Sequence, residues 1–291
     1  MAANFLFNIN SAKERINDLQ SQLASGKKVQ KPSDNPAATS DILRLTTALD
    51  RNQQFQKNVS DGEGALDATA NSLDGVAGVL QEVQSILVSV NNGTAGDTLP
   101  AQGDRIDELM NEAIGLANTQ FNGKYLFSGT ATTTQPFSIA ANPTPPPSQT
   151  VTYAGNGAPI TYMIGEGITQ QVNIDGQTAF QGTAIFNELI QIRDTLRAGG
   201  TPTAADSNAI AGMLNNVLLA NSKAGSMMQI LDNTGSNLTE QYNQLLSLRS
   251  GQQDTDVAGA TLQLTQNQTM LSAALSVAAK VLPQSLVNFL S

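Results

Sequence analysis

Apolar residues recur at helical spacing over most of the chain. Near the start they step by four, three, four, three and four residues, the a and d spacing of a coiled coil, through Phe5, Ile9, Ala12, Ile16, Leu19 and Leu23. Leucine then occupies every seventh position at Leu66, Leu73, Leu80 and Leu87. A further run with three- and four-residue steps extends from Leu214 to Leu245. These patterns predict long helices that each bury one apolar stripe against another helix.

Two short polar segments interrupt the helical pattern near the ends of the chain. In the first, Gly26 ends a helix, and turn-forming or helix-capping residues follow at Pro32, Ser33, Asp34 and Pro36. The second segment, SGQQDTD, precedes a last helix whose apolar stripe contains Leu264, Leu271, Leu275, Ala278, Leu282 and Phe289. We expect both segments to act as joints between consecutive helices.

The middle of the chain has a different character. Short runs of β-branched and aromatic residues lie at 125–127, 137–139, 151–153, 160–164 and 171–174, separated by GNG, GEG and DG turns. The NPTPPPS stretch between two of them predicts an extended loop. Residues 128–184 therefore read as a small β domain inserted between helices.

The order of these elements predicts a mainly α fold with a β insert. We expect an elongated rod of long coiled-coil helices formed by both chain ends, with the small β domain at its far end. The expected regions are a terminal coiled-coil assembly region (1–30 and 255–291), a helical rod domain (31–127 and 185–254) and the inserted β domain (128–184). Polar Asn221 lies on the inward stripe of the rod, where it is expected to fix helix register.

The two terminal helices can pair with each other, but neither has a further partner within the chain. Their remaining apolar surface is therefore expected to meet neighbouring copies. The predicted assembly interface consists of Phe5, Ile9, Ile16, Leu19, Leu23, Leu271, Leu275, Leu282 and Phe289.

Composition argues against catalysis. The chain has no His, Cys or Trp, which removes the usual general base, the thiol nucleophile and the common zinc ligands. Between residues 128 and 184 the only acids are Glu166 and Asp175, so a hydrolase grafted onto the insert is disfavoured. GEGITQ lacks the third glycine of a nucleotide-binding loop, and DNTGSNLTE lacks the central glycine of a calcium loop. We expect no catalytic residues, no cofactor and no metal.

Charge and hydropathy restrict the partners. Lys and Arg total 15 against 24 Asp and Glu, for a net charge of -9, which argues against nucleic acid. Only 13% of residues are charged, which suits packing against copies of the same chain because like-charge repulsion stays small. No run approaches the roughly 18 uninterrupted apolar residues of a membrane span, so no membrane partner is expected. The start of the chain has no basic n-region or small-residue cleavage site of a secretory signal.

Three stretches resemble a known family. LASGKKVQKPSDNPAATSDILRL is similar to the helix, turn and helix near the start of bacterial flagellin-family proteins. QFNGKYLFSGT, followed by QPF, resembles the stretch that leads from rod to variable domain in the hook-filament junction branch of that family. TDVAGATLQLTQNQTMLSAALSVAAKVLPQSLVNFLS resembles the family's terminal helix. Together they cover both chain ends and most of the helical rod.

The resemblance implies a noncatalytic structural subunit at the junction between hook and filament. It further implies export through the flagellar type III apparatus without a cleaved signal peptide, and assembly outside the cell as a ring of copies. The implied neighbours are a hook-associated protein and flagellin, and a cytoplasmic export chaperone is implied on the C-terminal helix. Pro283 within VLPQSLVNFL resembles flagellin itself, so the filament subunit stays the alternative. Whether TATTTQPFS carries an O-linked sugar is left open.

Overall fold

The computed structural model describes residues 2–93, 98–141 and 147–287, and the surroundings of the side chains within 6–93, 98–141 and 147–277. It confirms a mainly helical fold with a small strand-containing middle region. The chain divides into two compact units, one formed by residues 1–52 and 240–291 and the other by residues 53–239. The three regions expected from the sequence have other bounds than these two units, and their division stays a prediction.

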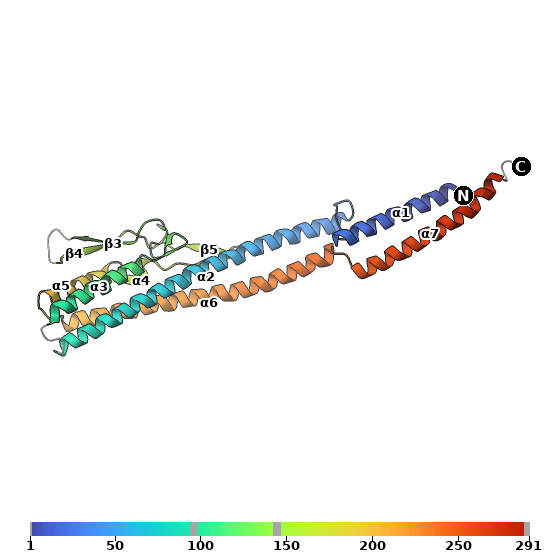
Figure 1. Cartoon of the computed structure of the whole chain (residues 1–291). Helices are drawn as coiled ribbons and strands as arrows, with labels where there is room; N and C mark the ends of the chain where they lie inside the picture. The colour runs from blue at the N-terminus through green and yellow to red at the C-terminus, as the bar shows by residue number, and fades with distance from the viewer. Residues whose placement is uncertain (1, 94–97, 142–146, 288–291) are drawn as a thin grey trace. The chain divides into compact units, whose positions relative to one another are not determined.

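The unit formed by both chain ends consists of helices. It contains α1 (Ala2–Ser25) and α7 (Val257–Val287), with the first part of α2 (Pro36–Asn91) and the last part of α6 (Ala204–Gln253). α1 and α7 contact each other and lie side by side (Figure 1). As expected, the segment around Pro32 ends where α2 begins, and the SGQQDTD segment spans the break between α6 and α7.

In the unit of residues 53–239, α2 and α6 contribute apolar stripes with a seven-residue period. The buried residues that follow this period are Val59, Leu66, Leu73, Leu80 and Leu87 on α2, and Ile210, Val217, Ala224, Leu231 and Leu238 on α6. These residues belong to one hydrophobic core. The heptad leucines seen in the sequence are therefore confirmed as core residues, as the a and d spacing requires. Asn221, on the same stripe, donates a hydrogen bond to Asp74 of α2.

Three shorter helices complete the helical part of this unit. They are α3 (Leu99–Ala117), α4 (Gly176–Phe180) and α5 (Ala184–Arg197). α3 and α5 pack against each other, and each places a row of apolar residues in the core. Asp175 caps α4, because its side chain accepts a hydrogen bond from the backbone N–H of Thr178.

The strands form three separate antiparallel hairpins instead of one sheet. β1 (Gln120–Phe121) pairs with β2 (Lys124–Tyr125), β3 (Phe137–Ala141) with β4 (Gln149–Tyr153), and β5 (Thr161–Gly165) with β6 (Ile168–Gln171). The first hairpin turns at Asn122 and Gly123, both with positive φ, as a two-residue hairpin turn of this twist requires. Two-stranded hairpins are marginal alone, so they depend on packing against helices.

That packing is aromatic. Phe137 of β3 lies 4.9 Å from Phe186 of α5, and Phe127 lies 4.8 Å from Phe180 of α4, measured between ring centroids. All four rings are fully buried in the same core as α2 and α6. The hairpins therefore have no core of their own within the described residues, and they fold as part of the helical unit.

A buried cation joins the second hairpin, β3 and β4, to the helices. The side chain of Arg193 on α5 is 1% exposed, and its guanidinium donates to Asp107 of α3 at 2.6 Å and to Gln149 of β4 at 2.7 Å. Burial lowers the pKa of Arg193, but hydrogen bonds to Asp107 and Asp194 outweigh this and raise it. A buried charge is tolerated only when it is paired in this way, so Arg193 fixes how α3, α5 and β4 meet.

A glycine lets the first hairpin approach α2. A Cβ atom at Gly64 would lie 2.7 Å from the ring of Phe121, closer than carbon atoms can pack. The absence of a side chain at this position therefore allows the hairpin to rest on the helix.

Leu73→Ala should destabilise the unit of residues 53–239 by about 2–5 kcal/mol, because Leu73 is fully buried and its removal leaves a cavity. Leu219→Ala on α6 is the matched control, since Leu219 is 69% exposed. Chemical denaturation followed by circular dichroism measures both. Equal midpoints for the two variants would contradict the assignment of Leu73 to the core.

Candidate assembly interface

The two terminal helices bury one face against each other. On α1 the buried residues are Ile9 and Ile16, each 8% exposed, and Leu19 and Leu23 are half-buried beside them. On α7 Ala260 is buried. Because α1 contacts α7, these residues hold the pair together within one chain.

A second apolar stripe runs along α7. Leu262, Met270 and Val277 are 61%, 67% and 53% exposed. At 3.6 residues per turn they fall within about 80° of one another, on a different face from Ala260, Leu264 and Leu271. We call this set the outer stripe. Because three large apolar side chains lie exposed along one side of the helix, the outer stripe is a candidate interaction surface.

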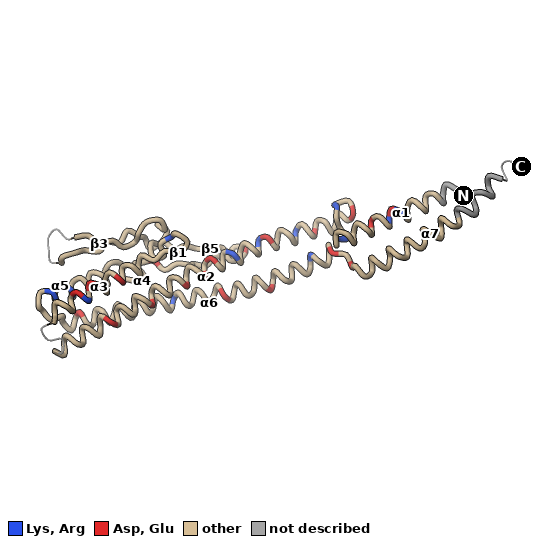
Figure 2. The backbone as a smooth tube through the Cα atoms, viewed as in Figure 1, with Lys and Arg blue, Asp and Glu red and all other residues tan. Residues whose placement is uncertain are grey.

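Charge distinguishes α7 from α1. From Val257 to Val277, α7 carries no charged residue, whereas the exposed positions of α1 include Lys13, Glu14, Arg15 and Asp18. Figure 2 shows this difference along the two helices. A partner can cover the outer stripe without desolvating a charge, which is the costly part of forming an interface. A partner on the outer surface of α1 would have to desolvate these charges, although this helix also exposes Leu6 and Phe7.

The two connecting segments are hydrogen-bonded to each other. The backbone N–H of Lys28 donates to the carbonyl of Gln253 at 2.8 Å, and that of Thr255 donates to the carbonyl of Gly26 at 2.9 Å. The ammonium group of Lys28 also donates to the carbonyl of Gly251 at 2.7 Å. These hydrogen bonds hold the segment that follows α1 against the segment that precedes α7.

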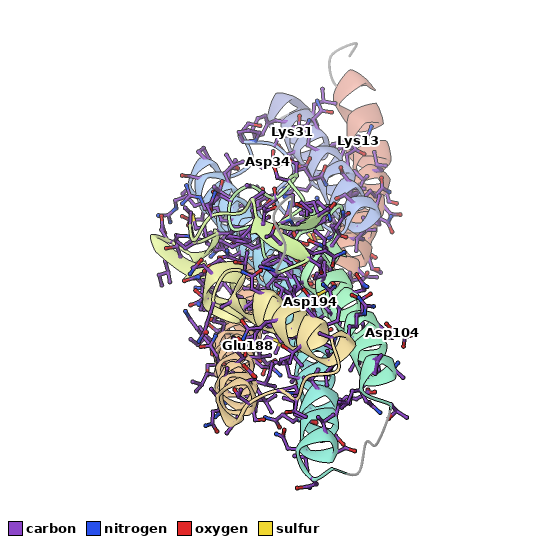
Figure 3. The ribbon with its side chains drawn as sticks, turned by 90° about the vertical axis from the view of Figure 1, so that its left-hand side faces the viewer. Lys13, Lys31, Asp34, Asp104, Glu188 and Asp194 are labelled. Atoms are coloured by element: carbon purple, nitrogen blue, oxygen red, sulfur yellow. The ribbon has the colours of Figure 1, made fainter. Side chains whose placement is uncertain are left out.

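Asp34 organises the first joint. Its Oδ2 atom accepts hydrogen bonds from the backbone N–H groups of Lys31 at 2.9 Å and Gln30 at 3.0 Å, and Figure 3 labels Lys31 and Asp34 in this loop. These two bonds, Lys31 first, lower the pKa of Asp34. The carboxylate form is therefore the one that closes the loop. Pro32 and Ser33 are exposed within the same turn.

Helix caps fix where the next helices start. The Oδ1 atom of Asn35 accepts from the backbone N–H of Ala38 at 3.0 Å, and Pro36 stands at the first position of α2, where its missing N–H costs nothing. The carboxylate of Asp256 accepts from Ala258 and Gly259 at the start of α7. Gly26, at φ +70°, ends α1 in the left-handed conformation expected of it.

The structure places the residues of the predicted interface in different surroundings. Ile9 and Ile16 are buried, Leu19, Leu23 and Leu271 are half-buried, and Leu275 is 47% exposed. The side chains of Phe5 and Leu282 lie outside those described, and Phe289 lies outside the described residues. Their role in assembly stays a prediction. All of the described ones except Leu275 belong to the side of the pair that faces inward.

Sequence reasoning missed the outer stripe. Leu262, Met270 and Val277 are eight and seven residues apart, so the stripe was present as a weak heptad signal. The stronger repeat through Leu264 and Leu271 on the same helix concealed it. A helix with two apolar repeats needs two partners, and this signal was available in the sequence.

Other kinds of site find little support in the part of the chain that is described. No group of three or more acidic residues within it could hold a metal ion. By length and composition alone α2 could cross a membrane, with an 18-residue window of mean hydropathy 1.2. Half of that window is buried inside the fold, as in the core helices that meet the same criterion.

Comparison with known proteins gives a family match for the first part of the chain. Residues 1–132 match the family model described as the bacterial flagellin N-terminal helical region, which covers α1, α2, α3 and the first hairpin. Over these residues the chain is a bacterial flagellin N-terminal helical region. This region includes α1, the first joint and α2.

The relatives that the chain matches have two kinds of name. The chain is 29% identical over 248 residues to flagellar hook-associated protein 3 of Salmonella typhimurium, covering 80% of this chain and 70% of the relative. It is 26% identical over 231 residues to the Escherichia coli protein of the same name, covering 79% and 69%. It is also 24% identical over 311 residues to Bacillus subtilis flagellin, covering 99% and 97%.

Solved structures share the fold of this chain. A structure described as a flagellar hook-associated protein from Vibrio parahaemolyticus superposes with a TM-score of 0.67 at 21% identity, over 76% of this chain and 100% of that one. Bacillus cereus FlgL gives 0.60 at 22% identity, over 71% and 99%. At these identities the likeness concerns the fold.

Asp34→Ala should open the first joint, because the N–H groups of Gln30 and Lys31 lose their acceptor. Amide hydrogen exchange at these two residues should become faster. In the unchanged chain the same loss should occur on acidification. The pKa of Asp34 is lowered, so the contribution is present at neutral pH and is lost as pH falls below the ordinary value of 3.8 and through the folded-state pKa. Asp41→Ala, at an exposed ion pair of α2, is the control. Unaltered exchange in Asp34→Ala would refute this role.

Proposed function

We propose that this chain is a structural subunit of the bacterial flagellum that forms the junction between hook and filament. Two relatives named flagellar hook-associated protein 3 support the junction, with most of both chains aligned. The structural observation that carries the proposal is the outer stripe, Leu262, Met270 and Val277, which a lone chain leaves in water. Such a surface belongs to a protein that functions when assembled.

The proposed assembly is a ring of copies between a hook-associated protein and flagellin. Residues 1–30 and 255–291 would form its coiled-coil region, in which Ile9 and Ile16 hold α1 to α7 and the outer stripe meets the neighbours. Residues 31–127 and 185–254 would form the rod domain, with 128–184 as the insert. The low charge of α7 supports this arrangement, because identical subunits with a net charge of -9 each would otherwise repel one another.

Export completes the proposal. The chain would leave the cell unfolded through the flagellar type III apparatus, without a cleaved signal peptide, and act outside the cell. A cytoplasmic chaperone would cover the C-terminal helix until export, since an amphipathic helix is readily bound in an apolar groove. The outer stripe would then be used twice in turn, first by the chaperone and later by neighbouring subunits.

The relatives and solved structures named above are structural flagellar proteins, and we infer that this chain has no catalytic activity. The absence of histidine and cysteine from its sequence supports the inference. Its role would be mechanical, because it would join the hook to the filament.

The alternative is the filament subunit itself. The alignment with Bacillus subtilis flagellin supports it, because that alignment spans 99% of this chain and 97% of the flagellin. The two roles differ in copy number and place. A junction subunit is present only where hook and filament meet, whereas a filament subunit is present along the whole filament.

Deletion of the gene, followed by electron microscopy and analysis of the culture medium, separates these roles. A junction subunit predicts cells with hooks and no filaments, and abundant flagellin in the medium. Immunogold labelling of the complemented strain should then mark one site at the base of each filament. Label along the whole filament, with loss of the major filament protein on deletion, would establish the alternative.

Met270→Asp should abolish assembly while leaving the chain helical. The substitution places a carboxylate on the exposed outer stripe, where it is harmless in water but would cost several kcal/mol, by order of magnitude, in an apolar contact. The control is Asn17→Asp, which adds the same charge to an exposed position of α1. Circular dichroism of the purified chains and filament counts on complemented cells are the measurements. Normal filaments in Met270→Asp cells would exclude the outer stripe as an assembly surface.

A further inference from the structure

Charge is divided unequally between the two units of the chain. The unit of residues 1–52 and 240–291 holds nine Lys and Arg residues against eight Asp and Glu residues, so its net charge is +1. The unit of residues 53–239 holds six against sixteen, so its net charge is -10. Between copies, like-charge repulsion is therefore strongest where two units of residues 53–239 meet. It is absent on average where one of them meets the other kind of unit.

The unit formed by both chain ends contains a hollow with two cations among its lining residues. The hollow has a volume of about 570 Å³, large enough for several side chains. Ile42 and Leu246 supply apolar lining, and Lys27 and Arg249 supply positive charge. The lining also includes Asp254, so two positive charges stand against one negative charge. We call this site the basic hollow.

Arg249 lacks an acceptor within the part of its own chain that is described. Its side chain is half-buried, yet it makes no hydrogen bond or ion pair with residues 6–93, 98–141 or 147–277. A guanidinium carries five N–H donors, and partial burial without acceptors costs free energy. Arg193, by contrast, is buried and paired with Asp107 and Asp194. The unmet donors of Arg249 fit an acidic partner.

The unit of residues 53–239 carries a site of opposite charge. Glu63 and Asp67 of α2 and Asp232 of α6 line a second hollow, together with Ser60 and Met228. No basic residue of the described chain is among its lining residues. We call this site the acidic hollow.

Glu63 is the counterpart of Arg249. It is half-buried, and its carboxyl group has no hydrogen bond or ion pair in the described part of the chain. Desolvation first, and the charge of Asp232 second, raise the pKa of Glu63 above the ordinary value of 4.5. Both causes act on a carboxyl group that lacks a cation beside it. A guanidinium would supply the missing donors and offset the charge of Asp232.

We propose that Arg249 and Lys27 of one copy enter the acidic hollow of a neighbouring copy and pair there with Glu63 and Asp232. The occupant is a second copy because the two hollows have opposite charge and each contains a half-buried charged group without a partner. These groups have already lost part of their hydration, so pairing recovers hydrogen bonds at a reduced desolvation cost. The pairs would fix the register of neighbouring copies, in addition to the contact of the outer stripe.

This inference rests on the assembly of copies proposed above, but not on which part of the flagellum they form. A junction and a filament both place copies of one chain side by side. The contact between the hollows can therefore be tested in isolated flagella for either role.

The first test is cross-linking, because the chain has no cysteine of its own. Thr46→Cys places a thiol in the basic hollow, and Ser60→Cys places one in the acidic hollow. Flagella are isolated from a deletion strain that carries both substitutions in one chain, and a short bis-maleimide is added. The spacer tolerates the spread of distances across the two hollows. Denaturing gels should show multimers of this chain, and either substitution alone should leave monomers.

The second test exchanges the charges. Arg249→Glu and Glu63→Arg should each reduce the amount of this chain in isolated flagella by about tenfold or more, because like charges then face each other. The double variant restores opposite charges between copies and should recover most of that amount. Arg44→Glu is the matched control, since Arg44 is 78% exposed and lies two residues from both Ile42 and Thr46, on the other side of α2.

The outcomes separate this inference from the proposed function. Flagella that contain the double-cysteine chain but give only monomers, or links to another protein, would overturn the pairing of the hollows. So would normal assembly of both single charge reversals. Absence of the chain from isolated flagella would overturn the proposed function, and this inference with it. The cross-linking test keeps the charges unchanged, so it decides the question even if a reversed chain does not fold.

Discussion

α7 presents two apolar faces, and the described chain supplies one helix to cover them. α1 covers the face that includes Ala260, and the face that includes Met270 stays exposed. Among the described residues, α1 has a single buried face and its outer surface carries charged residues. The assembly proposed for this protein would supply a partner for the exposed face of α7.

The two joints determine how α1 and α7 are presented to a partner. Backbone hydrogen bonds between Lys28 and Gln253, and between Thr255 and Gly26, keep the ends of the two connecting segments together. α1 and α7 are thus presented as a pair, with one apolar face already buried. An assembling subunit then loses less conformational freedom than two separate helices would. Asp34, by closing the first joint through two backbone N–H groups, is the polar side chain on which this arrangement most depends.

The sequence predicted what periodicity controls and failed where packing decides. Leucine at every seventh position, from Leu66 to Leu87, correctly identified one buried face of α2. The joints were also predictable, since Pro36 and Gly26 act through the local backbone. The fold of the middle region was read less well: strands were recognised, but Phe137 and Phe127 pack into the helical core. Only long-range contacts reveal this.

The candidate interface shows the same limit. Apolar residues at three- and four-residue steps indicate that a helix has an apolar face, but they do not indicate which partner covers that face. Ile9 was recognised as apolar and is buried within the pair, whereas Met270, on the exposed stripe, was overlooked. Arg193 was not recognised either, because its burial depends on Asp107 and Gln149, far away in the sequence. Partners that lie far apart in the sequence leave no periodic pattern from which their contact could be predicted.

The most direct measurement uses the absence of cysteine from the chain, which allows a single thiol to be placed at will. Met270→Cys reports on the outer stripe and Asn17→Cys on the exposed surface of α1, each by its rate of reaction with a maleimide. Our account predicts that both thiols react rapidly in the purified chain, and that Cys at position 270 is protected in isolated flagella while the thiol at position 17 reacts faster than it does. Equal, rapid labelling of position 270 in the purified chain and in flagella would contradict it, because the outer stripe would then have no partner.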